Sequence, residues 1–528
     1  MVEYGPEAAA EPRWLPARFE ACPETGLVFA LVGIALAIRL YLSLTSFCIS
    51  GDGVAYLGMA HRFAAGDPAA AMKSVFSPLY PCLIAIVHYV IPGWELAGEL
   101  VSVITGSAAV AIIYYLMREV FERRDVAFGA AALAAIHPEL AAYSASVRTE
   151  AGFILLITTT VLLMIRGLKR RRAALIIAAG ACGGFAYLYR TEGIGLLLVC
   201  SVFIPAGALL WRRWNFTWSL GATLGFAVAF VAVASPYLLF LRVSTGHWNI
   251  GREFTAAMMY GMGEVAPHRQ AWRQLGFSTS ASPIATIIAN PRLYIEKVAG
   301  DVGASFYGFL QALGPVLTAL MLLGLWWRKR LFTRFAETFL LILVLFYFCG
   351  FALTYTGTRF MVHFIAFTFG WVIVGLAALT QSARRLAAAM RWRLPPITVA
   401  LVIALILLPR TLWPIGYDLR GFRYAAREIA RRGGKPRAIV ARDGRVAYYA
   451  GMKLIALPAR PVNLCGWLDE RENADYLLIG NRDERKFGIQ RAAHCLVFVK
   501  RYPRYGTGYY DLFAIRSSTS GVSRADIK

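Results

Sequence analysis

Long apolar runs separated by short polar loops dominate the first 413 residues of the chain. Runs of about 17 to 25 apolar residues can cross a membrane as helices. The pattern predicts eleven spans, at residues 27–46, 95–117, 126–144, 151–166, 173–189, 193–211, 216–240, 305–327, 336–354, 360–380 and 396–413. Because only about ten residues separate Pro81 from Pro92, the apolar stretch 79–91 is too short to cross, and we expect a juxtamembrane or re-entrant helix there.

Basic residues recur after every second predicted span, and the first such cluster precedes span one. The clusters are Arg13 and Arg18, Arg118 with Arg123 and Arg124, Lys169 to Arg172, Arg212 and Arg213, Arg328 to Arg330, and Arg384, Arg385, Arg391 and Arg393. Since Lys and Arg are retained in the cytoplasm, we place all of them on the cytoplasmic side. An odd number of spans then places the C-terminal segment outside.

Composition changes abruptly at Trp413-Pro414, where short alternating patterns replace the apolar runs. These patterns predict helices at 424–431 and 445–450 and strands at 438–441, 453–457, 476–479, 496–500 and 510–515. The predicted fold is therefore an all-α polytopic membrane domain with a small C-terminal extracytoplasmic α/β domain. Its expected parts are a cytoplasmic segment at 1–26, the transmembrane domain at 27–413 and the α/β domain at 414–528.

Composition supports a membrane protein and argues against nucleic-acid binding. The 528 residues are 58% hydrophobic and 16% charged, which is too apolar for an ordinary soluble domain. The net charge of +24 is divided among short clusters between spans, so it indicates topology and not a nucleic-acid surface. The eight cysteines lack metal-ligand spacing; Cys465 and Cys495 share the C-terminal region, and the sequence leaves their pairing open.

Ionisable residues gather at the predicted outer ends of the spans. Asp52 follows the first span between two glycines, and two similar turns read Val147-Arg148-Thr149-Glu150-Ala151 and Tyr189-Arg190-Thr191-Glu192-Gly193. Further candidates are Arg39 inside the first span, Arg359 in the turn Thr356 to Phe360, and His363 and His137 near the same ends. Structural alternatives are a helix cap for Asp52, local ion pairs in the two turns, and snorkelling for Arg39.

Carboxylates and arginines at one edge of a bilayer suit a specific chemistry. Arginines can hold a lipid phosphate through two parallel hydrogen bonds. A carboxylate nearby can take the proton of an acceptor hydroxyl. Together, these groups could displace a lipid phosphate by an alcohol.

These residues resemble the GT-C superfamily of integral membrane glycosyltransferases over about the first 380 residues. The similarity is strongest to the bacterial branch that contains aminoarabinose and galacturonic acid transferases of lipid A, and to relatives of protein O-mannosyltransferases. The motifs that carry it are Asp52 with Tyr56, Ser77-Pro78-Leu79-Tyr80-Pro81, His137-Pro138-Glu139 leading to Thr149-Glu150, and Gly183-Gly184-Phe185 leading to Arg190-Thr191-Glu192-Gly193. One departure is Gly53, which stands where the family often has a second acid.

The resemblance implies roles for these residues. Asp52 would be the catalytic or acceptor-orienting carboxylate, and Glu150 would line the same cavity. Arg190 would hold the donor phosphate, and Arg359 would do likewise. The remaining substrate-binding candidates are Arg39, Tyr56, Tyr80, Arg148, Glu192 and His363.

The function implied is inverting transfer of a sugar from a polyprenyl-phosphate donor to an extracytoplasmic lipid, glycan or protein acceptor, in a bacterial inner membrane. No cofactor is assigned and no metal-ligand residues are identified, which leaves a divalent metal open. The alternatives are a transporter or lipid flippase and a structural or assembly protein. Transporters usually show repeated halves and interrupted helices, and the sequence shows neither pattern.

Overall fold

The structure is a computed structural model that describes most of the chain. It describes residue 14 and residues 22–212, 214–259, 283–328, 334–391, 395, 397–433, 437–458, 461–471, 473–492, 494–503 and 508–516. The chain divides into two compact units. The membrane unit comprises Met1–Tyr41, Met59–Ala145 and Thr149–Leu412, and the sheet unit comprises Leu42–Gly58, Ser146–Arg148 and Trp413–Lys528.

Among the described residues, seven helical segments are long and apolar enough to cross a membrane. They are α1 (Glu24–Leu44), α5 (Trp94–Phe121), α8 (Glu150–Arg170), the turn η2 (Thr191–Gly193) continued by α10 (Ile194–Trp211), α11 (Phe216–Thr245), α17 (Phe335–Leu353) and α18 (Thr358–Ala389). Two bent pairs raise the number to nine. The apolar helices α4 (Leu79–His88), α9 (Ala173–Tyr189) and α19 (Thr398–Thr411) are shorter, so a count of eleven spans is not confirmed.

The bent pairs break at prolines. α6 (Arg124–Ile136) meets α7 (Pro138–Ser144) at 57°, and α15 (Pro291–Leu313) meets α16 (Pro315–Trp327) at 100°. Proline lacks an N–H and clashes with the preceding turn, so a helix bends or ends there. Interrupted helices are therefore present, contrary to our interpretation of the sequence.

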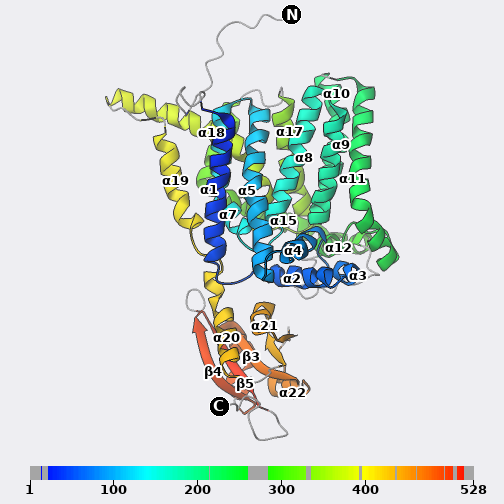
Figure 1. Ribbon diagram of the computed structural model, residues 1–528, viewed down its shortest axis with the longest axis vertical. Coiled ribbons are helices and arrows are strands. Elements are labelled where there is room, and N and C mark those ends of the chain that lie inside the picture. Colours follow the sequence, from blue (N-terminus) through cyan, green and yellow to red (C-terminus); the bar gives the residue numbers. More distant parts are fainter. Residues whose placement is uncertain are drawn as a thin grey trace, which may run out of the picture. The chain divides into compact units, whose positions relative to one another are not determined.

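Small residues allow the helices of the membrane unit to approach closely. α9 packs against α8 and α11, and Figure 1 shows these helices side by side. A Cβ atom at Gly180 of α9 would lie 2.2 Å from the carbonyl oxygen of Phe226 in α11, and one at Gly324 of α16 would lie 1.9 Å from that of Trp371 in α18. Close backbone contact of this kind is how helices associate in lipid, where apolar surface alone gives little drive.

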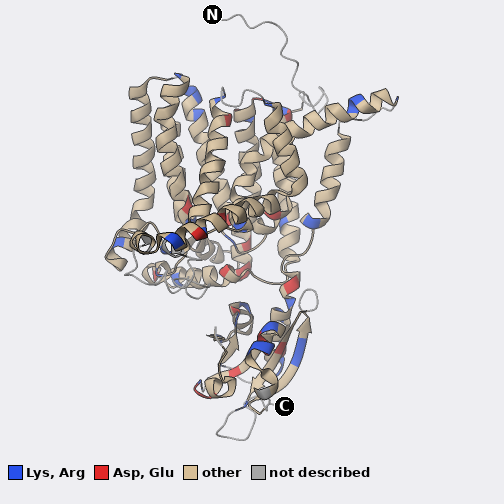
Figure 2. Ribbon diagram, turned by 180° about the vertical axis from the view of Figure 1, so that it is seen from behind, with Lys and Arg blue, Asp and Glu red and all other residues tan. Residues whose placement is uncertain are grey.

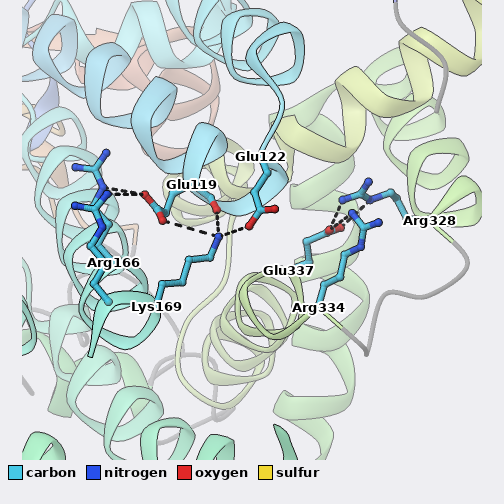
Figure 3. Close-up of polar contacts among 8 residues, drawn as sticks. Glu119, Glu122, Arg166, Lys169, Arg328, Arg334 and Glu337 are labelled. Atoms are coloured by element: carbon cyan, nitrogen blue, oxygen red, sulfur yellow. Dashed lines mark hydrogen bonds and ion pairs between the residues drawn. The ribbon is translucent and has the colours of Figure 1, made fainter. Parts of the chain in front are cut away.

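Charged residues mark both ends of the helices and leave their middles apolar (Figure 2). At one end, Glu119 of α5 accepts a hydrogen bond from Nε of Arg166 at 3.1 Å, and Lys169 donates to the carbonyl oxygen of Glu119 (Figure 3). Glu337 of α17, which is fully buried, pairs with Arg328 and Arg334. We call this the Glu119 end; α8 begins at the other, the Glu150 end.

Four short helices complete the non-spanning part. They are α2 (Gly51–Ala64), which the two units share, α3 (Pro68–Met72), α12 (Arg252–Met259) and α14 (Pro283–Ala289). Figure 1 shows α3, α4 and α12 lying across the end of the bundle at which α8 begins. The helix expected at 79–91 is thus present as α4, whose ten residues extend about 15 Å.

The sheet unit is a five-stranded mixed sheet with the order β2-β1-β3-β5-β4. The strands are β1 (Ala438–Ala441), β2 (Lys453–Ala456), β3 (Ala474–Gly480), β4 (Leu496–Pro503) and β5 (Tyr509–Ile515). β1 pairs in parallel with β2 and β3, and β5 pairs antiparallel with β3 and β4. All five expected strands are present, so the predicted fold class, a helical membrane domain with a small C-terminal α/β domain, is confirmed.

Helices cover both faces of this sheet. They are η4 (Tyr417–Leu419), α20 (Arg420–Arg431), α21 (Gly444–Ala450), α22 (Leu464–Asp469), α23 (Asn481–Phe487) and η5 (Ile489–Ala492). Side chains alternate along β1, so Ile439 packs with Phe422 of α20 while Val440 packs with Leu464 of α22. Cys465 and Cys495 form a disulfide, with Cα atoms 5.8 Å apart.

Candidate functional site

Arg190 lies where two helices of the membrane unit meet. α9 ends at Tyr189, Arg190 is extended, and the turn Thr191–Gly193 starts the next helix. The Nη1 of Arg190 donates to Oγ1 of Thr149 at 2.8 Å, and its Nη2 donates to Oε1 of Glu192 at 2.6 Å. A Cβ atom at Gly193 would lie 2.4 Å from the backbone nitrogen of Tyr187, so glycine is required for this tight return.

Glu150 joins this pair to a helix far along the chain. It is the first residue of α8 and is fully buried, at a helix end where the backbone dipole stabilises a carboxylate. Nε of Arg359, in the first turn of α18, donates to Oε1 of Glu150. The same oxygen lies 3.9 Å from Nη1 of Arg190. We call Glu150, Arg190, Glu192 and Arg359 the Glu150 cluster.

The cluster combines two carboxylates and two guanidinium groups in a largely apolar setting. Rings of Phe153 and Phe360 lie 6.0 Å and 5.5 Å from the guanidinium carbon of Arg190. Burial alone would lower the pKa of Arg190, but the carboxylates of Glu192, Glu253 and Glu150 raise this pKa above its ordinary value. Arg190 therefore stays charged despite being buried.

Exposure differs between the two arginines. The side chain of Arg359 is 24% exposed, whereas that of Arg190 is 4% exposed and that of Glu150 is fully buried. An incoming anion would therefore meet Arg359 first. Both arginines keep the flat, forked geometry that matches a phosphate group.

His363 lies one helical turn after Arg359 and is fully buried. Its ring centroid is 5.0 Å from that of Phe153. Neither ring nitrogen has a hydrogen-bond partner among the residues that the structure describes. A buried imidazole with two unsatisfied nitrogens beside an ion cluster is a candidate ligand-binding group.

Tyr80 contacts the residue that precedes Arg190. Its ring centroid lies 5.6 Å from that of Tyr189, and its hydroxyl donates to the carbonyl of Gly98 at 3.0 Å. Tyr189 in turn occupies the space left by the missing side chain of Gly152, where a Cβ atom would lie 2.2 Å from the tyrosine hydroxyl. Tyr80 is thus separated from Arg190 of the Glu150 cluster by one residue, Tyr189, whose ring it contacts.

Arg39 has a different environment. It is buried in α1, and its guanidinium donates to the carbonyls of Ala134 and Ala135 at 3.2 Å and 3.1 Å. Pro138 has no N–H to give to the carbonyl of Ala134, four residues earlier, so Arg39 supplies the missing hydrogen bond. This contact gives Arg39 a structural role at the bend between α6 and α7.

Asp52, Tyr56 and Arg148 belong to the sheet unit. Asp52 lies in the first turn of α2, and Arg148 lies in the short segment Ser146–Arg148. Ser50 connects the two stretches, because its hydroxyl donates to the carbonyl of Val147 at 2.8 Å and accepts from the N–H of Gly53 at 2.9 Å. The predicted site residues therefore form one group in the membrane unit and a second in the sheet unit.

Some residues around the Glu150 cluster were not predicted as site residues from the sequence. Thr149, Phe153 and Phe360 contact Arg190, and Glu253 of α12 contributes to its charge environment. Thr149 stands inside the first Arg-Thr-Glu turn, which is a signal that could have indicated it. The sequence also suggests that the outer loop from about 242 to 304 shapes acceptor recognition, and its residues His268 and Trp272 lie outside the described residues.

In the part of the chain that the structure describes, one group has His, Cys or acidic ligand atoms close enough to hold a metal ion. Cys465, His494 and Cys495 place these atoms within 4.8 Å of one another. The two cysteine sulfurs are joined in the disulfide and are therefore not thiolate ligands. This group is not a metal centre while the disulfide is intact.

Comparisons with known proteins show a shared fold and a partial family match. Residues 75–240 match the family model of dolichyl-phosphate-mannose-protein mannosyltransferase, a segment that contains Tyr80, Glu150, Arg190 and Glu192. The chain resembles the structure of ArnT from Cupriavidus metallidurans bound to undecaprenyl phosphate, with a TM-score of 0.58 and 14% identity over 96% of this chain and 99% of that one. No curated protein sequence matches.

A second structure of similar fold is the archaeal oligosaccharyltransferase AglB from Archaeoglobus fulgidus, in complex with an inhibitory peptide and a dolichol-phosphate. Its TM-score is 0.55, with 14% identity over 93% of this chain and 74% of that one. At this identity, the likeness establishes the fold. The chain therefore shares the fold of ArnT and AglB, and its residues 75–240 resemble the dolichyl-phosphate-mannose-protein mannosyltransferase family.

Proposed function

We propose that this protein transfers a sugar from a polyprenyl-phosphate donor to a hydroxyl of an acceptor on the extracytoplasmic side of the membrane. The reaction is a single displacement. The acceptor oxygen forms a bond to the anomeric carbon as the bond from that carbon to the phosphate oxygen breaks, with inversion. The polyprenyl phosphate leaves, and the acceptor proton passes to a carboxylate and then to water.

The observation that carries this proposal is the contact of Glu150 with two arginines from distant parts of the sequence. Arg190 and Arg359 both form ion pairs with Oε1 of Glu150. Arg190 is buried, and Arg359 is partly exposed. A charged group fixed before the substrate arrives stabilises developing phosphate charge without having to reorganise. Arg359 and Arg190 therefore bind the donor phosphate, and Glu150 positions both guanidinium groups.

The other candidate residues take supporting roles in the proposal. Asp52 accepts the proton of the acceptor hydroxyl, a role that suits a carboxylate in the first turn of a short helix. Glu192 holds Arg190 in place through their 2.6 Å contact, and His363 offers two unsatisfied ring nitrogens to the donor. Tyr56, Tyr80 and Arg148 are further substrate-binding candidates in the proposal.

The ligands of the similar structures support a lipid-phosphate donor. The ArnT structure is bound to undecaprenyl phosphate, and the AglB structure contains a dolichol-phosphate and a peptide. Both ligands combine a phosphate with a polyprenyl chain, which a membrane-embedded arginine pair can recognise from within the bilayer. We extend this donor class, and a bacterial inner-membrane location, to the present chain.

Binding of farnesyl phosphate, a short polyprenyl phosphate, tests the role of Arg359. We expect Arg359→Gln to weaken binding by about tenfold or more, since one charge-assisted contact to phosphate is lost. The matched control is Arg292→Gln, because Arg292 is an exposed arginine of α15 that pairs with Glu296 in its own helix. Equal affinity of wild type and Arg359→Gln, measured by calorimetry on the purified protein in detergent, would remove Arg359 from donor recognition.

Transfer itself is tested in proteoliposomes with a panel of radiolabelled polyprenyl-phosphate sugars and a total lipid and glycan extract as acceptor. We expect Asp52→Asn to retain farnesyl phosphate binding and to lose transfer. Wild-type turnover by this variant would exclude Asp52 as the base. The same vesicles measure movement of donor between leaflets, and movement without any transfer would favour a flippase, whose interrupted helices this fold shares.

A further inference from the structure

α20 of the sheet unit directs three arginines towards one cavity. Arg420, Arg423 and Arg427 are spaced by three and four residues, so they share one side of the helix. They line a cavity of about 390 Å³, a size that suits a small ligand or a lipid headgroup. The other lining residues are Leu44, Thr45, Ser46, Phe47, Pro414 and Tyr424.

The lining of this cavity carries positive charge that its own residues do not balance. None of the nine lining residues is Asp or Glu, and three are arginines. Arg420 donates to the carbonyl of Tyr417 at 3.2 Å, and Arg423 donates to the hydroxyl of Tyr449 at 3.4 Å. The partners in these two contacts are a carbonyl and a hydroxyl, which help to orient the guanidinium groups.

Aromatic rings hold two of the arginines in place. The guanidinium carbon of Arg420 lies 3.8 Å from the ring centroid of Tyr417, and that of Arg423 lies 4.7 Å from the centroid of Tyr449. Stacking on a ring leaves the N–H edges of the guanidinium available for an anion. A planar fork held in this way is well suited to the oxygens of a phosphate group.

Covalent connection places the cavity at the membrane surface. Leu44 is the last residue of α1, one of the seven long apolar helices, and Phe47 follows three residues later. Three residues extend at most about 11 Å, so this wall stays within headgroup depth of the end of the span. Leu44 and Phe47 also give the cavity an apolar side that an acyl chain could contact.

We propose that this cavity binds the phosphate headgroup of an anionic membrane lipid, at a site distinct from the Glu150 cluster. The shared chemistry is a phosphate group, which three arginines can neutralise. The lipid form is favoured over free phosphate because the lining combines those arginines with apolar residues at headgroup depth. The proposal does not depend on glycosyl transfer.

Calorimetry on the full-length protein in neutral detergent tests this site with three probes: dioctanoyl phosphatidic acid, inorganic phosphate and dioctanoylglycerol. We expect phosphatidic acid to bind about tenfold or more tightly than inorganic phosphate, and dioctanoylglycerol, which has no phosphate, not to bind. The variant Arg420→Gln/Arg423→Gln/Arg427→Gln should weaken phosphatidic acid binding by about tenfold or more. The control Arg431→Gln/Arg482→Gln/Arg485→Gln removes the same charge from exposed positions of the same unit and should change affinity less than about twofold.

Since Arg423 contacts Tyr449, a double variant, Arg420→Gln/Arg427→Gln, repeats the test with that contact intact. Unchanged phosphatidic acid affinity in both cavity variants would overturn the site. If the wild type bound inorganic phosphate and phosphatidic acid with equal affinity, the proposal that the occupant is a lipid would be wrong.

Farnesyl phosphate separates this proposal from the proposed function. Farnesyl phosphate also joins a phosphate to an apolar chain and can occupy both sites, so the cavity variants should keep the binding that Arg359→Gln weakens. If Arg359→Gln left farnesyl phosphate binding intact while the cavity variants still lost phosphatidic acid, donor recognition at Arg359 would fail and the lipid site would stand. If the cavity variants instead lost all binding of farnesyl phosphate, the claim that the two sites are distinct would be overturned.

Discussion

At the scale of single residues, one buried carboxylate determines the geometry of the candidate site. Glu150 is fully buried and contacts Arg359 and Arg190, while Glu192 contacts Arg190. Removing one partner from a buried ion group leaves charge that the surroundings do not compensate. Glu150 and Arg190 each pair with two groups of opposite charge, and Glu150 is the one that connects both arginines.

We expect Glu150→Gln to lower stability by roughly 3 kcal/mol, because both arginines then lose a buried counter-ion. Farnesyl phosphate should raise the melting temperature of this variant more than that of the wild type, since its phosphate supplies the missing negative charge. Thermal unfolding in detergent, with and without farnesyl phosphate, gives both values.

Glu119→Gln provides the control for this experiment. It removes a carboxylate that also contacts basic residues, namely Arg166, Lys169 and Arg170, but at the opposite end of the helices. Its stability should fall without any added response to farnesyl phosphate. An equal ligand response in the two variants would contradict a phosphate site at Glu150.

At the scale of helices, the bend between α6 and α7 explains why an arginine is buried in α1. Pro138 leaves the carbonyl of Ala134 without its helical partner, and Arg39 donates to that carbonyl and to that of Ala135. Thr411 of α19 donates to the carbonyl of Ile136 at the same bend. In lipid, such carbonyls require partners from the protein.

Arg39→Gln should therefore destabilise the protein, and Pro138→Ala should partly restore it by returning an N–H to the carbonyl of Ala134. A coupling of about 0.5 to 3 kcal/mol between the two changes is expected, as for residues that share one hydrogen-bond partner. Unfolding midpoints of the single and double variants measure this coupling. If the stability changes of the two single variants simply added in the double variant, and if Arg39→Gln lost farnesyl phosphate binding while Pro138→Ala kept it, a substrate role for Arg39 would be favoured instead.

The contact between α2, α4 and α5 should respond to pH. The ring of Trp94 lies 3.8 Å from that of His61 and 3.6 Å from that of His88. Partial burial, together with the charge of His88, lowers the pKa of His61 below its ordinary 6.5. The folded protein thus favours neutral His61, so stability is complete above pH 6.5 and falls as pH drops below that value towards the folded pKa.

Melting temperatures recorded between pH 8 and pH 5 test this expectation. His61→Gln should reduce the loss of stability on the acid side, because glutamine has no proton to gain. His247→Gln is the control, since His247 is an exposed histidine outside this contact. An identical acid response in wild type and His61→Gln would show that other groups cause it.

At the scale of the whole molecule, local patterns in the sequence predicted local structure well. The short apolar run at 438–441 predicted β1 at its observed bounds, and the two Arg-Thr-Glu turns indicated the charged residues at the starts of α8 and α10. The contact between Glu150 and Arg359 could not be deduced, because 209 residues separate them and no local pattern encodes their packing. The bends at Pro138 and Pro315 were overlooked because each apolar run continues across its proline.

Long-range packing also determined which unit a segment joins. Residues 42–58 include the end of the first span, yet Cys48 packs with Phe422 and Ile439 in the core of the sheet unit. The N–H of Ile49 donates to the hydroxyl of Tyr449, 400 residues later. Such pairings depend on tertiary structure, so an analysis of hydrophobic runs assigns the segment to the membrane domain.

The disulfide tests the sidedness on which the proposed function depends. Disulfides persist in oxidising compartments and are rare in the cytosol. If the sheet unit lies outside, Cys465 and Cys495 should be joined in protein taken directly from cells, whereas Cys22 and Cys349 should react with a thiol reagent after denaturation. Mass spectrometry of peptides alkylated before and after reduction distinguishes the two sets.

The stability of the sheet unit gives a second measure of the same bond. The disulfide joins residues 30 apart, and closing a loop of that length stabilises a fold by roughly 3 to 4 kcal/mol. Cys465→Ser/Cys495→Ser should therefore unfold more easily than the wild type, and a reducing agent should affect the wild type alone. If both thiols were instead free in cells and bound zinc together with His494, the sheet unit would face the cytoplasm, and an extracytoplasmic Asp52 would be wrong with it, since Asp52 belongs to the same unit.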